Sequence, residues 1–226
     1  MEDDYTVVMK DTVTPDPRHI RHEALADRRR ELILEAARSA FMELGMDKAS
    51  IREIARRAGY TAGAIYSYFD GKDALYGALL DESLERLNTQ VQQALSPDAN
   101  HASRLQRAAR AFFDFYHHNP QDLDLGFYLF QGVQPRGLTP ALNRQLNAKL
   151  HAALQPSQQA LEALGMVPEQ AQAEVTALFA HIVGLLLLGH SGRMRMFGQQ
   201  PETLFDAYVG ELVARATMGE KPEDAW

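Results

Sequence analysis

The sequence contains no cysteine, and its longest run of apolar residues, Ile182 to Leu188, is only seven residues long. The first absence excludes a disulfide framework and any thiolate metal site. The second argues against a membrane-spanning helix, which needs about 20 apolar residues. Residues 1–17 are acidic and lack the apolar core of a secretory signal. We therefore expect a cytoplasmic protein with no membrane partner, whose residues 1–17 form a flexible tail.

Catalytic motifs are also missing from the sequence. It has no HExxH pair, no phosphate-binding loop of the Walker type and no GxSxG elbow. His117 and His118 are adjacent and point to different sides of a helix, while His181 and His190 are nine residues apart. Two metal ligands on one helix face need a spacing of about three or four. We predict no catalytic residue, no metal and no cofactor.

Positive charge is scarce overall but concentrated near the N-terminus. The chain has 23 Lys and Arg against 30 Asp and Glu, a net charge of −7. Residues 18–72 carry 11 Lys and Arg against 8 Asp and Glu, whereas the remainder carries 12 against 22. Contact with DNA phosphates needs a local basic surface and not a basic whole protein. The alternative for each arginine is a solvated helix face.

Residues 50–75 carry the pattern of a helix-turn-helix. Ser50 can cap a first helix, and Glu53 can reach back to the Ser50 amide to complete a capping box. Gly59 can end that helix in the left-handed conformation. Thr61 can then cap a short second helix that begins with small residues. Such a helix is typical of a motif that enters the DNA major groove.

The run AGYTAGAIYSYFDGKDAL resembles the signature of the tetracycline-repressor (TetR) family of transcriptional regulators, and the likeness extends over roughly residues 29–80. The resemblance implies an all-helical homodimer that binds DNA and responds to a small molecule. Two positions depart from the pattern. Ala62 stands where the family often has Lys or Arg, and Gly71 stands where Ser or Asn commonly caps the next helix, which leaves Asp70 as a substitute cap.

The motif also predicts roles for individual residues. Small side chains at the start of the second helix let the backbone and methyl groups approach base edges. Lys72 and the Ser50 amide region are expected to hold phosphates. Phe69 should anchor the helix to the core. The predicted DNA-binding residues are Ser50, Thr61, Ala62, Gly63, Ala64, Tyr66, Ser67, Tyr68 and Lys72.

The whole chain is predicted to be all-α, with an N-terminal three-helix helix-turn-helix DNA-binding domain at residues 18–72 and a C-terminal helical ligand-binding and dimerisation domain at residues 73–226. Four prolines mark helix starts, because the first helical amide needs no partner. Pro156 is expected to kink or split its helix. The predicted helices cover residues 24–44, 51–58, 62–69, 72–95, 101–118, 120–131, 139–164, 168–191 and 201–218.

The last two predicted helices have wide apolar faces that could form a four-helix bundle with a second copy. The TetR resemblance implies dimerisation of this kind, and a two-fold dimer suits a palindromic operator. The alternative is that these faces belong to the core of the protomer. The predicted dimerisation residues are Val175, Leu178, Phe179, Ile182, Leu186, Leu204, Phe205, Tyr208 and Leu212.

Seven aromatic residues lie between positions 112 and 130. One helix face cannot hold them all, so some are expected to line a cavity between helices. The alternative is that they are ordinary core residues. The predicted ligand-binding residues are Phe112, Tyr116, Phe127, Phe130, Gln131 and His181, and the effector is expected to be an apolar or aromatic small molecule.

These features predict a ligand-responsive, sequence-specific transcriptional repressor that binds a palindromic double-stranded DNA operator as a homodimer. An all-helical enzyme would need a paired acid and base or a metal cluster, and the sequence offers neither. The other alternative is an all-helical protein-interaction module that dimerises without reading DNA. Salt dependence separates the two, because DNA binding weakens steeply with salt.

Overall fold

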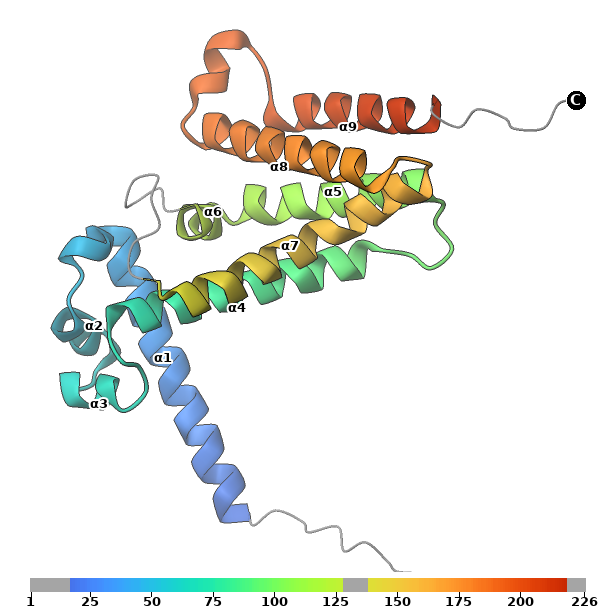
Figure 1. Cartoon of the computed structure of the whole chain (residues 1–226). Coiled ribbons are helices and arrows are strands. Elements are labelled where there is room, and N and C mark those ends of the chain that lie inside the picture. Colours follow the sequence, from blue (N-terminus) through green and yellow to red (C-terminus); the bar gives the residue numbers. More distant parts are fainter. Residues whose placement is uncertain (1–16, 128–137, 219–226) are drawn as a thin grey trace, which may run out of the picture.

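The computed structural model describes residues 17–127 and 138–218, and within these ranges all regular structure is helical. The all-α prediction is therefore confirmed. Figure 1 shows α1, α2 and α3 gathered into a small head at one end of a bundle formed by α4 to α9. The helices are α1 (Pro17–Lys48), α2 (Ile51–Ala58), α3 (Ala62–Tyr66), α4 (Lys72–Ala94), α5 (His101–His118), α6 (Pro120–Gly126), α7 (Pro140–Ala163), α8 (Pro168–His190), the short 3-10 helix η1 (Arg193–Phe197) and α9 (Pro201–Met218).

The head is built around one stripe of α1. Ile33, Ala37 and Phe41 recur at helical spacing and are fully buried, and Phe41 contacts Tyr76 of α4 with ring centroids 6.5 Å apart. The backbone leaves the helical conformation at Gly45, where φ is 74°, so the chain turns there toward α2.

The body is organised around α4, which follows the head directly. Helix α7 lies along both α4 and α5, α8 packs on α7, and α9 packs on α8 and α5. Gly77 permits the closest approach of α4 to α7, since a Cβ there would lie 2.4 Å from Leu142 Cδ2. Gly189 has the same role between α8 and Pro201, where the corresponding distance is 2.6 Å.

Some predicted helix boundaries are wrong. Helix α1 begins at Pro17 and not near residue 24, because proline is well suited to a first helical position. Helix α3 ends at Tyr66, short of residue 69, and α6 ends at Gly126; residues 128–131 of its predicted extent lie outside the described ranges. Helix α7 is not split, because it continues through Pro156, which lies buried in the core.

Helix α8 is the most apolar element of the body. By length and composition alone it could cross a membrane, although no apolar run in it approaches 20 residues. In this fold one side of α8 packs on α7 and α9, and 33% of its apolar segment is buried. The remaining apolar surface of α8 is open in a single copy of the chain.

Candidate nucleic-acid interface and effector cavity

Helix α2 begins with the predicted cap but without the complete capping box. Ser50 Oγ accepts a hydrogen bond from the Glu53 amide at 3.1 Å. The Glu53 carboxylate does not reach back to Ser50; it binds Arg56 at 2.7 Å and Arg57 at 2.8 Å. Those guanidinium groups lower the pKa of Glu53 to about 2. The reciprocal half of the box is therefore a wrong prediction, since two arginines one turn away compete for the same carboxylate.

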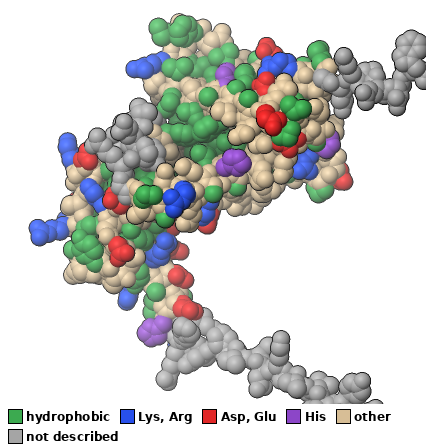
Figure 2. All heavy atoms as spheres, in the orientation of Figure 1, with side chains coloured by type: hydrophobic (Ala, Val, Ile, Leu, Met, Phe, Trp, Pro, Cys, Tyr) green, Lys and Arg blue, Asp and Glu red, His purple; other side chains and the backbone are tan. Residues whose placement is uncertain are grey.

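The arginines of α2 differ in what they can contact. The Arg57 side chain is only 16% exposed and binds Glu43 Oε2 at 2.7 Å and Ser39 Oγ at 2.9 Å, which ties α2 to α1. Arg56 is 71% exposed, and Arg52 is also exposed. Figure 2 shows Lys and Arg side chains projecting from the head. Arg52 is thus available to an anionic partner, Arg56 is exposed but paired with Glu53, and Arg57 is structural.

Helix α3 presents small and hydroxylated residues to solvent. Thr61 Oγ1 accepts a hydrogen bond from the Ala64 amide at 3.2 Å, so the predicted cap is present. Ser67 Oγ donates to the Ala64 carbonyl at 2.8 Å. Ile65 is fully buried and holds the helix against the head, while Tyr66 is exposed. Of the remaining predicted contacts, Gly63 is exposed and Ala62, Ala64 and Tyr68 are partly buried. The exposed side of α3 can therefore approach another surface closely.

The start of α4 differs from the expected arrangement. Lys72 Nζ donates to the Met46 carbonyl near the end of α1, so in this state the ammonium group is turned toward the head. The N-cap is Gly71, which has no side-chain cap, and Asp70 does not replace it. The φ of Gly71 is 132°, a conformation that a Ser or Asn side chain would strain. Backbone geometry thus explains why glycine stands at this position.

A partly open cavity of about 280 Å³ lies between α4, α6 and α7, beside the aromatic cluster that was predicted to form one. Tyr116 and Phe127 belong to its wall, and Asn147 is its amide-bearing residue. Burial raises the pKa of Tyr116 above its usual range, so the hydroxyl stays protonated and can act as a hydrogen-bond donor. The full lining is Leu80, Leu84, Tyr116, Gly126, Phe127, Leu146, Asn147 and Leu150.

Other aromatic rings support this wall from behind. Phe112 packs edge-on against Tyr116, with ring centroids 5.3 Å apart, and against Phe179 at 5.9 Å. Phe127 contacts Tyr116 at 5.6 Å and Phe179 at 5.8 Å. Phe112 and Phe179 are thus core neighbours of the cavity and not part of its lining. Phe112 therefore does not line the cavity as predicted, and the dimerisation role of Phe179 stays a prediction.

His181 lies away from the cavity, contrary to its predicted ligand-binding role. Its ring stacks on Tyr208 of α9 at 4.2 Å, and burial lowers the pKa of His181. A two-residue step rotates the helix by about 200°, which carries His181 to the side opposite Phe179. Two further predicted ligand-binding residues, Phe130 and Gln131, lie outside the described ranges.

Helix α6 joins the cavity to the head. Asp122 is buried, and its Oδ1 lies 2.6 Å from Arg86 Nη2 of α4 and 3.5 Å from Arg38 Nη1 of α1. Four residues later α6 reaches the cavity wall. Tyr76 Oη of α4 donates to the Leu125 carbonyl at 2.6 Å. Asp122, Arg38 and Arg86 were not predicted from the sequence, because an acid at the third position of a helix is usually exposed and nothing in the pattern signals its burial.

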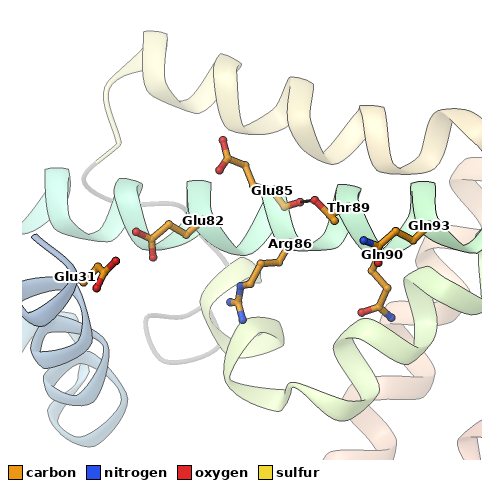
Figure 3. A pocket seen from close by; sticks show the side chains of 7 residues that line it. All are labelled: Glu31, Glu82, Glu85, Arg86, Thr89, Gln90 and Gln93. Atoms are coloured by element: carbon orange, nitrogen blue, oxygen red, sulfur yellow. Dashed lines mark hydrogen bonds between the residues drawn. The ribbon is translucent and has the colours of Figure 1, made fainter. Parts of the chain in front are cut away.

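A larger but open groove runs along α4 (Figure 3). Its volume is about 670 Å³, and its lining is almost entirely polar or charged: Glu31, Glu82, Glu85, Arg86, Thr89, Gln90 and Gln93. Figure 3 shows Glu31 reaching it from α1. Ligand sites are usually enclosed and mostly apolar, so the smaller cavity is the better candidate for a small molecule.

The predicted dimerisation residues are mostly buried within one protomer. Six of the nine are inaccessible to a partner in this structure: Val175, Leu178, Ile182, Leu186, Phe205 and Leu212. Leu204 and Tyr208 are partly buried. The outward sides of α8 and α9 carry stripes of small residues instead, comprising Ala173, Ala177, Ala180 and Gly184 on α8 and Thr203, Ala207, Gly210 and Ala214 on α9.

Histidine and carboxylate groups meet at the junction of α5, α8 and α9. His117 Nε2 lies 2.9 Å from Glu202 Oε1, and the His117 ring stacks on His190 at 5.9 Å. Within the described part of the chain, no group of three His, Asp or Glu side chains could hold a metal ion. These contacts tie α5 to α8 and α9.

The N-terminal part of the chain matches a known family model. Residues 33–79 match the model of bacterial regulatory proteins of the tetR family. The HTH-type transcriptional activator FasR of Mycolicibacterium smegmatis is 39% identical over 101 residues, which cover 45% of this chain and 46% of that relative. The HTH-type transcriptional repressor Rv1474c of Mycobacterium tuberculosis is 44% identical over 68 residues, covering 30% and 36%. The matched segments span less than half of either relative.

Solved structures resemble the chain over a greater length. The transcriptional regulator FadR from Bacillus subtilis, in complex with stearoyl-CoA, has a TM-score of 0.61 with 16% identity and covers 84% of this chain and 99% of its own. A tetR-family protein from Rhodococcus RHA1 has a TM-score of 0.61 with 22% identity and covers 84% and 96%. At these identities the likeness concerns the fold alone.

Proposed function

From the premise that this chain carries a DNA-binding domain of the tetR family, we propose that it is a cytoplasmic, ligand-responsive transcriptional repressor that binds a palindromic DNA operator as a homodimer. The observation that carries the proposal is α3, a short capped helix that presents Gly63, Tyr66 and Ser67 to solvent. The domain division at residues 72 and 73 belongs to the same proposal. No catalytic role is included.

We propose that α3 reads the major groove with few charged contacts. Gly63 and the methyl groups of Ala62 and Ala64 allow close approach to base edges, and Tyr66 supplies an apolar surface for a thymine methyl. Lys72 holds a phosphate once it leaves the Met46 carbonyl. Sequence preference then depends on shape and methyl contacts more than on bidentate arginine.

Dimerisation uses the outward stripes of α8 and α9 in this proposal. Small side chains, which apart from Thr203 have one carbon or none, let helices of two copies approach closely. A Cβ at Gly184 or Gly210 would meet no atom of its own chain within 4 Å. The large apolar residues beneath the stripes fix the two helices in place. A two-fold dimer presents two α3 helices to successive major grooves.

The effector in this proposal is a small, mostly apolar molecule with one hydrogen-bonding group. The walls of the 280 Å³ cavity are chiefly Leu and aromatic rings, and Tyr116 and Asn147 are the polar groups that could orient a ligand. The Bacillus subtilis FadR structure contains stearoyl-CoA. Titration of this protein with the same compound tests whether the cavity also accepts a long acyl chain.

Occupation of the cavity is proposed to act on the head through α6. Phe127 at its end contacts the cavity, and Asp122 at its start binds Arg38 of α1 and Arg86 of α4. A ligand that shifts α6 changes how α1 and α4 are held together, and α4 is continuous with the turn that follows α3. The ligand alters DNA affinity only by its differential affinity for the two arrangements.

A binding experiment tests the response to ligand. DNA selected from random sequences is titrated with the protein, with and without stearoyl-CoA and a panel of small aromatic compounds. We expect at least one compound to raise the melting temperature and to weaken DNA binding by about 5- to 150-fold. Unchanged DNA affinity with every compound that binds would contradict ligand control. Salt-insensitive binding with no selected motif would favour the protein-interaction alternative.

A further inference from the structure

The N-terminal part of α1 projects beyond the rest of the head (Figure 1). Between positions 21 and 30 every residue except Ala26 is exposed, and Leu25 is 57% exposed. At the end of this stretch Arg30 contacts other elements: its guanidinium lies 5.2 Å from the Phe69 ring centroid and binds Glu82. This segment, residues 17–30, is called the arm below. Packing into the hydrophobic core therefore does not explain the residues of the arm, which are almost all exposed.

Charges on the arm are separated by side. At 100° per residue, Arg21, His22, Leu25, Arg28 and Arg29 fall within an arc of about 120°. The acidic residues Glu23, Asp27 and Glu31 fall within about 80° of one another, with Arg30 beside them. Glu31 lies about 60° from Arg28, and its Oε2 binds Arg28 Nη1 at 2.8 Å. The arm is therefore a helix with one predominantly basic and one predominantly acidic face, which meet at this ion pair.

Contacts farther along α1 show which way each face points. Ser39 and Glu43, which bind Arg57 of α2, continue the line of the basic face. On the acidic side, Glu31 borders the groove on α4 (Figure 3). Since α1 leaves the helical conformation only at Gly45, these directions hold along the arm. The basic face lies on the α2 side of α1, and the acidic face lies on the α4 side.

We propose that the basic face of the arm, carrying Arg21, Arg28 and Arg29, binds the phosphate backbone of DNA that flanks the operator half-site. The inference rests on the proposed DNA-binding function and extends the contact surface beyond the helix-turn-helix. Guanidinium groups suit phosphate because they are always charged and donate in a planar fork. Arg21 and Arg29 lie away from the acidic side, whereas Arg28 binds Glu31 at 2.8 Å and has to share or release that carboxylate to bind a phosphate.

The length of the arm sets how far the added contact reaches. Arg21, the outermost of the three arginines, lies about 14 Å from Arg30 at 1.5 Å per residue. That length spans about four base pairs at 3.4 Å each. The contact should therefore depend on about four base pairs of DNA outside the half-site, whatever their sequence.

The test combines an arm variant with two lengths of DNA. The full-length protein and its Arg21→Ala, Arg28→Ala, Arg29→Ala triple variant are titrated with the selected operator, either with ten flanking base pairs on each side or with none. We expect the variant to reduce the slope of log affinity against log salt by about two to three per bound protomer on the long DNA. Removal of the flanks should weaken the wild type but leave the variant unchanged. The recovered sequence motif should be the same for both proteins.

A matched control removes the same charge far from the head. The Arg104→Ala, Arg107→Ala, Arg193→Ala variant changes exposed or partly exposed residues of α5 and η1, and it should keep the wild-type salt slope. An equal reduction of the salt slope in this control variant would overturn the inference. An arm variant that keeps the wild-type salt slope and loses as much affinity as the wild type when the flanks are removed would also overturn it. A wild-type protein that selects no sequence at all would overturn the proposed function as well. Melting curves verify that all three proteins are folded.

Discussion

Replacement of Asp122 by Asn removes the charge that joins α6 to α1 and α4. The Asp122 side chain is 5% exposed, and its Oδ1 lies 2.6 Å from Arg86 Nη2 and 3.5 Å from Arg38 Nη1. Asparagine keeps the shape of the side chain and one oxygen acceptor, but it cannot neutralise the positive charge of either guanidinium group. The substitution therefore tests whether this ion pair network holds α6 to the head.

The expected cost follows from how well water can replace the lost partner. Removing one member of a fully buried pair costs about 3–5 kcal/mol. Here the Arg86 side chain is 50% exposed and that of Arg38 is 24% exposed, so both can be solvated after the change. We expect the free energy of unfolding to fall by about 1–2 kcal/mol. The melting temperature should then fall by about 2–8 °C for a protein of this size.

Urea unfolding measures the cost, and a double-mutant cycle with Arg38→Gln isolates the link between α6 and α1. The two substitutions should be non-additive by at least about 0.5 kcal/mol. Asp124→Asn is the matched control on the same helix; burial raises the pKa of Asp124, so its neutralisation should cost little. Additive effects of Asp122→Asn and Arg38→Gln, or an equal loss for Asp124→Asn, would refute the assignment of α6 as the connector.

Three further predictions concern other parts of the molecule. Ala177→Glu or Gly210→Glu should convert the dimer to a monomer in light scattering, because each puts a charge on an outward stripe; an unchanged mass would contradict the proposed interface. Glu53→Gln should lower the free energy of unfolding at pH 6. The difference in this free energy from wild type should shrink as pH falls from about 4.5 toward 2, because the pKa of Glu53 is lowered in the folded state to about 2. A difference that is independent of pH in urea titrations would count against the Glu53 ion pairs. Gly126→Val should reduce the rise in melting temperature caused by a bound effector while preserving the fold, because a Cβ there would lie 3.7 Å from Tyr116 Oη, an ordinary contact; full retention of that rise would argue that the ligand binds elsewhere.

Local sequence signals predicted the helices of this fold well. Prolines at positions 120, 140, 168 and 201 each stand at the first residue of a helix. Ser50 and Thr61 cap their helices, since each side-chain oxygen accepts a hydrogen bond from a backbone amide in the first turn. These features depend on neighbouring residues only, so the sequence contains what is needed to recognise them. The helix-turn-helix was predictable for the same reason.

Features that depend on distant residues were not predictable in detail. Asp122 is buried because α1 and α4 each bring an arginine to it, over separations of 84 and 36 residues. The large apolar residues of α8 and α9 were predicted to face a partner, yet most are buried against helices of the same protomer. Apolar periodicity identifies a buried face but not the surface that buries it. The cavity was predicted from the number of aromatic rings, whereas its leucine walls required knowledge of how α4 and α7 pack.

Selection of bound sequences from random double-stranded DNA tests the central claim most directly. We expect the wild-type protein to recover a palindromic motif whose half-sites are separated by about one helical turn, roughly 10 base pairs, because a two-fold dimer presents two α3 helices to the same side of the duplex. An Ala64→Leu variant, which obstructs close approach of α3, should recover a different motif or none. A single asymmetric half-site bound by a monomer, or no enrichment of any sequence, would contradict the account.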